Sequence, residues 1–201
     1  MPRNRRFWVL GGVVALAGAL MLLTTFASAA SNGAQHVSWD IISLVGGNPP
    51  GPINPGGHAS ATAPDGDTIT LTGSGTFVAP RGGNGGSHGV KGGGTWETSS
   101  GGSGTYTVTE LASWEFANYQ SDTPPLDDNI GGGRRANGSA LLKITFSDGV
   151  QGVLTVGCHG PGAPPGIFEG IATTKGYKTY YNVQPPVPGV DANRTIFHIR
   201  Q

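Results

Sequence analysis

The segment TYTVTELASWEF, residues 105–116, carries the pattern that decides the fold of this chain. Five of its six apolar side chains fall on even positions, while threonine and serine occupy most of the odd ones. Side chains alternate between the two faces of a strand, so this pattern predicts a half-buried β-strand. The apolar even positions are Tyr106, Val108, Ala112, Trp114 and Phe116.

Period-two segments recur along the chain, and helical periodicity is nearly absent after residue 30. They cover residues 36–44, 68–77, 95–98, 138–147, 153–159, 168–183 and 195–200. The dipeptide Asp148-Gly149 favours a tight hairpin between two of them. Segments rich in Gly, Pro and Asn predict loops at residues 46–67, 79–94, 118–137, 160–166 and 184–193.

About eight strands with hairpin-like links predict an all-β domain. A closed barrel and a two-sheet sandwich both limit the open edges of such a sheet. We favour a single antiparallel β-barrel, because glycines inside the strands, such as Gly73 and Gly75, are typical of sharp bends. A two-sheet β-sandwich is the alternative.

Residues 1–30 have the three parts of an export signal: a basic start, an uncharged apolar run and the small-residue ending ASAA. We therefore expect a cleaved signal peptide and a secreted or extracytoplasmic protein of the cell envelope. The apolar run is also long enough for an uncleaved anchor, which would be the chain's only contact with a membrane. Residues 31–67 are expected to form an N-terminal strand and a Pro/Gly-rich loop, and residues 68–201 the main β domain.

Charge and composition exclude several classes of function. Three of the 12 basic residues and none of the 12 acidic ones lie in residues 1–30, which leaves 9 against 12, a net charge of −3. Without a basic stripe, nucleic-acid binding is not expected. The five histidines are scattered without a metal-ligand spacing, so no metal or other cofactor is expected. Because Cys158 is the single cysteine, an internal disulfide is excluded. Cys158 shares the face of Leu154 and Val156 in the segment 153–159, which predicts a buried thiol.

The region from Gly138 to Arg200 contains an SDG hairpin, a CH dipeptide, an FEGI-x-x-TKGY segment and a terminal DANRT-x-FH. In these motifs it resembles a family of secreted, uncharacterised bacterial all-β proteins, which implies an exported all-β domain without an assigned activity. The glycine-rich strands and the GTF motif are more distantly similar to dirigent-like and allene-oxide-cyclase-like barrels. Neither resemblance assigns catalytic residues to this chain.

Three residues are candidates for acid–base catalysis: Glu110, His159 and His198. Glu110 shares the parity of the apolar face of residues 105–116. Its carboxylate is therefore either a polar group in a lumen or cleft, or one that is paired or displaced by a bulge. His159 borders a loop and could meet a partner such as His198. A cyclase or isomerase of the barrel type would need the three to converge.

Residues 168–181 combine aromatic side chains with one acid and one base. If this segment stays extended, Glu169, Lys175, Tyr177 and Tyr181 share a face that could bind a small molecule or a glycan. An amphipathic strand with solvated ends of Lys and Tyr is the alternative. Arg194 precedes the last strand and could bind a carboxylate or stabilise a turn.

These observations favour a non-catalytic domain that binds a small molecule, a glycan or a surface partner. The alternatives are a cyclase-like or isomerase-like barrel enzyme and a structural envelope protein.

Overall fold

The computed structural model describes residues 34–44, 51–79, 89–123, 125–185 and 193–200, all within the compact unit 32–201. The predicted export segment, residues 1–30, lies outside the described residues. Within them the chain forms strands and no helix, which confirms the predicted all-β class. The strands are β1 (Gln35–Leu44), β2 (Ile53–Pro55), β3 (Ala59–Thr62), β4 (Thr68–Leu71), β5 (Ser74–Ala79), β6 (Val90–Thr98), β7 (Ser103–Tyr119), β8 (Arg134–Phe146), β9 (Gln151–Cys158), β10 (Gly170–Lys175), β11 (Lys178–Tyr180), β12 (Asn182–Val183) and β13 (Thr195–Arg200).

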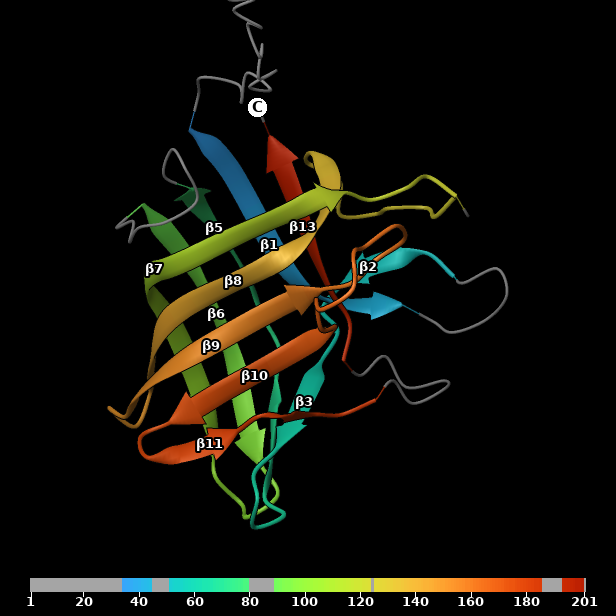
Figure 1. The fold of residues 1–201 in the computed structure, drawn as a ribbon. Helices are drawn as coiled ribbons and strands as arrows, with labels where there is room; N and C mark the ends of the chain where they lie inside the picture. The colour runs from blue at the N-terminus through green and yellow to red at the C-terminus, as the bar shows by residue number, and fades with distance from the viewer. Residues whose placement is uncertain (1–33, 45–50, 80–88, 124, 186–192, 201) are drawn as a thin grey trace, which may run out of the picture. The chain divides into compact units, whose positions relative to one another are not determined.

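Six of these strands close a ring, so the predicted antiparallel β-barrel is confirmed over the β-sandwich alternative. The order around the ring is β8, β13, β1, β5, β6 and β7, and β7 pairs back with β8. Figure 1 shows β7 and β8 crossing in front of the other four. Closure pairs each of these strands on both sides and so removes open edges from the ring.

Six of the remaining strands extend the ring on two sides, and β2 pairs with the end of β1. β9, β10 and β11 follow β8, whereas β4, β3 and β12 follow the C-terminal half of β6. Asp148-Gly149 forms the predicted hairpin between β8 and β9, closed by a 2.8 Å hydrogen bond from Phe146 N to Val150 O. The single sheet therefore includes strands outside the ring.

Large aromatic side chains fill the centre of the barrel. The rings of Phe77 and Phe197 meet Trp114 edge to face, with centroid distances of 5.4 Å and 4.6 Å. Trp39 is fully buried beside them in the same apolar cluster. Edge-to-face pairs favour this packing beyond the burial of area alone.

The long strand β7 confirms the predicted strand at residues 105–116 but not its single parity. Its register with β8 shifts at three irregularities, the first between Val108 and Glu110. A bulge adds one residue to one strand and exchanges the two faces beyond it. The first shift places Leu111 in the core, and the second, between Leu111 and Ser113, returns the even positions to it, so Trp114 is buried as predicted. Phe116, which was also predicted to lie in the core, is exposed near the end of the strand.

The predicted loop at residues 79–94 was assigned wrongly for its last five residues, which belong to β6. Gly75 of β5 pairs with Gly92 of β6, and the Trp39 indole packs over both. A Cβ on Gly75 would lie 2.7 Å from Trp39 Nε1, and one on Gly92 would lie 3.3 Å from the same ring. Here glycine permits a close approach inside a strand.

The segment at residues 168–183 is broken, not extended. β10 and β11 form a hairpin in which Lys175 pairs with Lys178, because Gly176 turns the chain back with a φ of 60°. The common face proposed for Glu169, Lys175, Tyr177 and Tyr181 therefore does not form.

Candidate functional site

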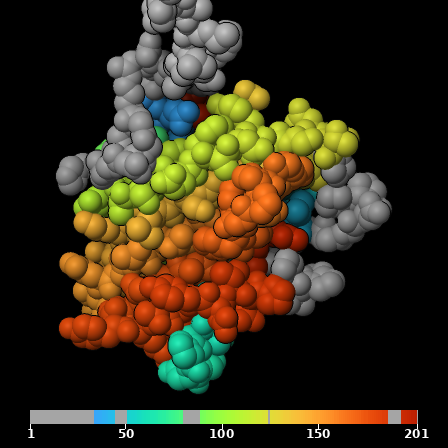
Figure 2. Space-filling view, viewed as in Figure 1, coloured from blue at the N-terminus to red at the C-terminus, as the bar shows by residue number. Residues whose placement is uncertain are grey.

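A cavity of about 500 Å³ lies beside the main core of the barrel, at one end of β1, β9 and β13. Neighbouring residues in a strand face opposite sides, so Ile41 packs into the core while Ile42 faces this cavity. In Figure 2 the orange loop after β9 lies beside blue-to-cyan atoms from the region of β1 and β2 and the red start of β13. The apolar wall of the cavity consists of Ile42, Leu44, Ile53, Leu126 and Ile196.

The part of this wall outside the ring consists of β2, which pairs with β1, and the segment at residues 126–130, which is hydrogen-bonded to β2. Ile53 N donates to Asp127 O at 2.8 Å, and Asn129 N donates to Ile53 O at 3.0 Å. A side-chain contact adds to these hydrogen bonds: His198 Nε2 on β13 lies 2.7 Å from Asp128 Oδ2. These contacts hold Ile53 and the segment that contains Leu126 against the outer face of the ring.

Glu169 lies at the polar end of the cavity. Its Oε1 accepts a hydrogen bond from Thr195 N at 2.7 Å, and its Oε2 accepts one from His159 N at 2.6 Å. Burial raises the pKa of Glu169 to about 7, although these two N–H groups and the charge of Arg194 act in the opposite direction. A carboxyl group with such a pKa exchanges its proton near neutral pH.

Arg194 supplies the positive charge beside Glu169. The preceding Asn193 fixes its position with a φ of 71° and a hydrogen bond from Ser60 N to Asn193 Oδ1. The Arg194 guanidinium makes no side-chain hydrogen bond or salt bridge to any other described residue. Arg194 lines the cavity, so its guanidinium can bind a group that enters there.

His159 has a defined tautomer at this site. Its Nδ1 lies 2.7 Å from Ile167 O. A carbonyl oxygen can only accept a hydrogen bond, so Nδ1 carries the proton and, in the neutral ring, Nε2 is the basic nitrogen.

Residues missed by the sequence analysis hold the loop after β9. Asn137, fully buried, accepts a hydrogen bond from Gly160 N at 2.8 Å and donates one to Asn118 Oδ1 at 2.9 Å. Gln120 donates to Cys158 Sγ at 3.2 Å. Cys158 is buried as predicted, and burial raises the pKa of its thiol well above the ordinary value. The thiol therefore stays un-ionised and contributes to packing beside the cavity.

Of the three catalytic candidates, His159 alone lines the cavity. Glu110 is displaced by the bulge in β7 and forms a 2.9 Å salt bridge with Lys143, which matches the second interpretation given for it. His198 is completely buried and bonded to Asp128. The structure does not bring these three side chains together in the cavity.

Of the predicted binding residues, Glu169 and Arg194 line the cavity and the others do not. Lys175 pairs with Asp148 and lies over the Trp96 ring, 4.4 Å from its centroid. Tyr177 is fully exposed in the β10–β11 turn, and Tyr181 is largely exposed after β11.

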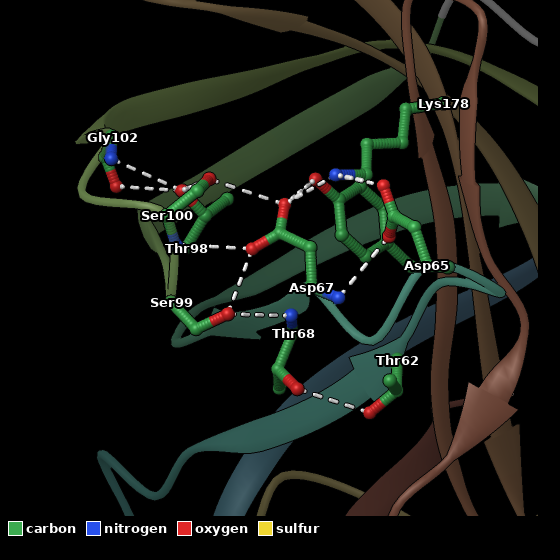
Figure 3. Close-up of polar contacts among 10 residues, drawn as sticks. Thr62, Asp65, Asp67, Thr68, Thr98, Ser99, Ser100, Gly102 and Lys178 are labelled. Atoms are coloured by element: carbon green, nitrogen blue, oxygen red, sulfur yellow. Dashed lines mark hydrogen bonds and ion pairs between the residues drawn. The ribbon is translucent and has the colours of Figure 1, made fainter.

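A second polar cluster, centred on Asp67, joins three segments that are distant in sequence (Figure 3). Asp67 Oδ1 accepts from Ser99 Oγ at 2.7 Å, and its Oδ2 accepts from Lys178 Nζ at 2.7 Å and Tyr180 Oη at 3.0 Å. The Lys178 ammonium holds the pKa of Asp67 far below its usual range. Because its bonds are made within the protein, this cluster serves as a structural clasp.

The fold and the cavity define a class: a closed antiparallel β-barrel with an amphipathic pocket on its outer side. Comparisons with known protein families, curated proteins and solved structures found no match. The described residues contain no group of three or more His, Cys, Asp and Glu that could hold a metal ion. Among the same residues, no helix is long and apolar enough to cross a membrane.

Proposed function

We propose that this barrel is a binding protein for a small amphipathic molecule, which enters the cavity beside β1, β9 and β13. The observation that carries the proposal is the arrangement of the cavity, with an apolar wall at one side and Glu169, Arg194 and His159 at the other. Ligand sites commonly combine apolar walls with a few polar groups that fix orientation. A volume of about 500 Å³ suits a small molecule more than a polymer.

The resemblance to secreted bacterial proteins and the predicted export segment support a role outside the cytoplasm. A protein in the cell envelope would meet small molecules of its surroundings, and the cavity offers them a hydrophobic surface.

A ligand screen followed by thermal unfolding and NMR tests this proposal. Ligands should raise the unfolding temperature and shift the resonances of Ile42, Ile196 and Glu169. The variant Leu126→Lys, which places a charge on the apolar wall, should lose this response, whereas Thr107→Lys on an exposed face of β7 should retain it. Shifts confined to residues away from the cavity would contradict the proposal.

One observation favours a second function, an enzyme that moves protons. Glu169 has a pKa of about 7 and lies in a cavity with the basic His159, which suits general acid–base chemistry of the isomerase or cyclase type. A ligand found in the screen would then exchange a C–H hydrogen for deuterium in D₂O, as measured by mass spectrometry. Glu169→Gln should abolish this exchange and retain binding. Equal exchange with and without the protein would reject the enzyme function.

A further inference from the structure

We propose that the ligand of the cavity carries one anionic head group, which Arg194 binds, and that Glu169 takes up a proton as this anion enters. This inference rests on the proposed binding function and specifies the chemistry and pH dependence of the same site.

A positive charge at the polar end of the cavity favours an anionic head group. Arg194 contributes one positive charge that no described residue neutralises through a salt bridge. An ammonium head group would be repelled there, and a neutral one would leave the guanidinium without an anionic partner. Carboxylate and similar anions match its planar set of donors.

Glu169 lies at the same end of the cavity as Arg194, where its charge would affect a bound anion. An ionised Glu169 would share the polar end with the ligand anion, and two negative charges at close range repel each other. The groups around its carboxyl are His159 and the Cys158 thiol from the end of β9, and Arg194 from the start of β13. Arg194 is the only fixed positive charge among these groups, so uptake of a proton relieves the repulsion, and we assign this proton to Glu169 because its carboxylate is the second anion.

In the free protein, Glu169 is already close to its protonated state. Burial raises the pKa of Glu169 to about 7, so near neutral pH a large share of the molecules carries the proton before the ligand arrives. Above this pKa the uptake of a proton costs binding free energy, and affinity for an anion therefore falls by up to tenfold for each pH unit.

A matched series of probes tests the inference: cyclohexaneacetate, cyclohexaneethanol and cyclohexaneethylammonium share one apolar body and differ in the charge of the head group. Affinities are measured by NMR titration at about pH 6 and about pH 8, between which the carboxylate probe stays ionised. We expect the anion to bind most tightly, and about tenfold more weakly at the higher pH, while the affinity of the alcohol changes little.

Variants separate the two parts of the inference. Arg194→Gln should remove the preference for the anion over the alcohol. Glu169→Gln should keep the preference and remove its pH dependence. The control Lys143→Gln removes a positive charge on the exposed side of β7 and β8, and should change neither.

The outcomes also separate this inference from the proposed function. Binding of the alcohol as tightly as the anion would overturn the inference and leave a small-molecule site. Persistence of the pH dependence in Glu169→Gln would overturn the role of Glu169. If none of the three probes bound, both proposals would fail, because even the shared apolar body would find no site.

Discussion

The raised pKa of Glu169 predicts that the barrel loses stability as the pH rises from about 4.5 to about 7. An acid whose pKa is higher in the folded state holds its proton more tightly there than in the unfolded chain. The resulting stabilisation is complete below the unfolded pKa of 4.5 and is lost as the pH rises through the folded pKa of about 7.

The size of this effect follows from the two pKa values. They differ by about 2.5 units, and each unit corresponds to about 1.4 kcal/mol, so the free energy of unfolding should fall by about 3 kcal/mol. Above about pH 7 the contribution of Glu169 should level off, because both states are then ionised. A fall of about 3 kcal/mol is a large part of the free energy of unfolding of an ordinary domain.

Urea unfolding of the wild type and of Glu169→Gln across this pH range tests the prediction. Subtracting one curve from the other removes the titration of groups that both proteins share. The carboxamide of the variant leaves either Thr195 N or His159 N without its acceptor. The variant therefore also loses an amount of unfolding free energy that does not depend on pH. The difference in unfolding free energy should therefore change by about 3 kcal/mol around this constant offset.

Ile42→Val provides the control, because it loosens the same cavity without removing a titratable group. Its difference curve should be flat. A flat curve for Glu169→Gln would refute the reasoning, since it would mean that the folded and unfolded states bind the proton of Glu169 equally well.

Three further predictions concern the framework around the site. Asn137→Ala should lower the free energy of unfolding by about 1–3 kcal/mol in urea titrations, because it removes a buried amide and leaves the part-buried Gly160 N–H without its acceptor. An unchanged midpoint would contradict this. Cys158 should react with a thiol reagent in urea but not in the native protein, and rapid native labelling would show that the thiol is accessible. Gly75→Ala should destabilise the barrel by more than about 2 kcal/mol, because its Cβ would lie 2.4 Å from Lys91 O, and wild-type stability of the variant would argue against this close strand packing.

Local sequence patterns predicted much of the fold because they depend on neighbouring residues alone. Alternation identified β1, β7 and β13, and Asp148-Gly149 identified the hairpin between β8 and β9. The same rule failed inside β7, where irregularities on either side of Leu111 exchange the faces locally, and in β6, whose glycines resemble a loop in composition. Bulges and close strand approaches depend on the partner strand, which a single segment does not reveal.

The site was predictable only in part. Glu169 was selected as the acid of the aromatic segment 168–181 and Arg194 as a residue before the last strand that could bind a carboxylate, and both line the cavity. Tyr177 and Tyr181 were grouped with them on the assumption of an extended strand, which the turn at Gly176 breaks.

The sequence by itself determined an all-β chain, the approximate positions of its main strands and a buried thiol at Cys158, because each depends on local composition and periodicity. The tertiary structure alone decided which strands close the ring and which polar groups meet. Ile53, Leu126 and Glu169 are far apart in the chain and form one cavity only through strand pairing around the barrel. The proton affinity of Glu169 has the same origin, since burial by distant segments raises its pKa.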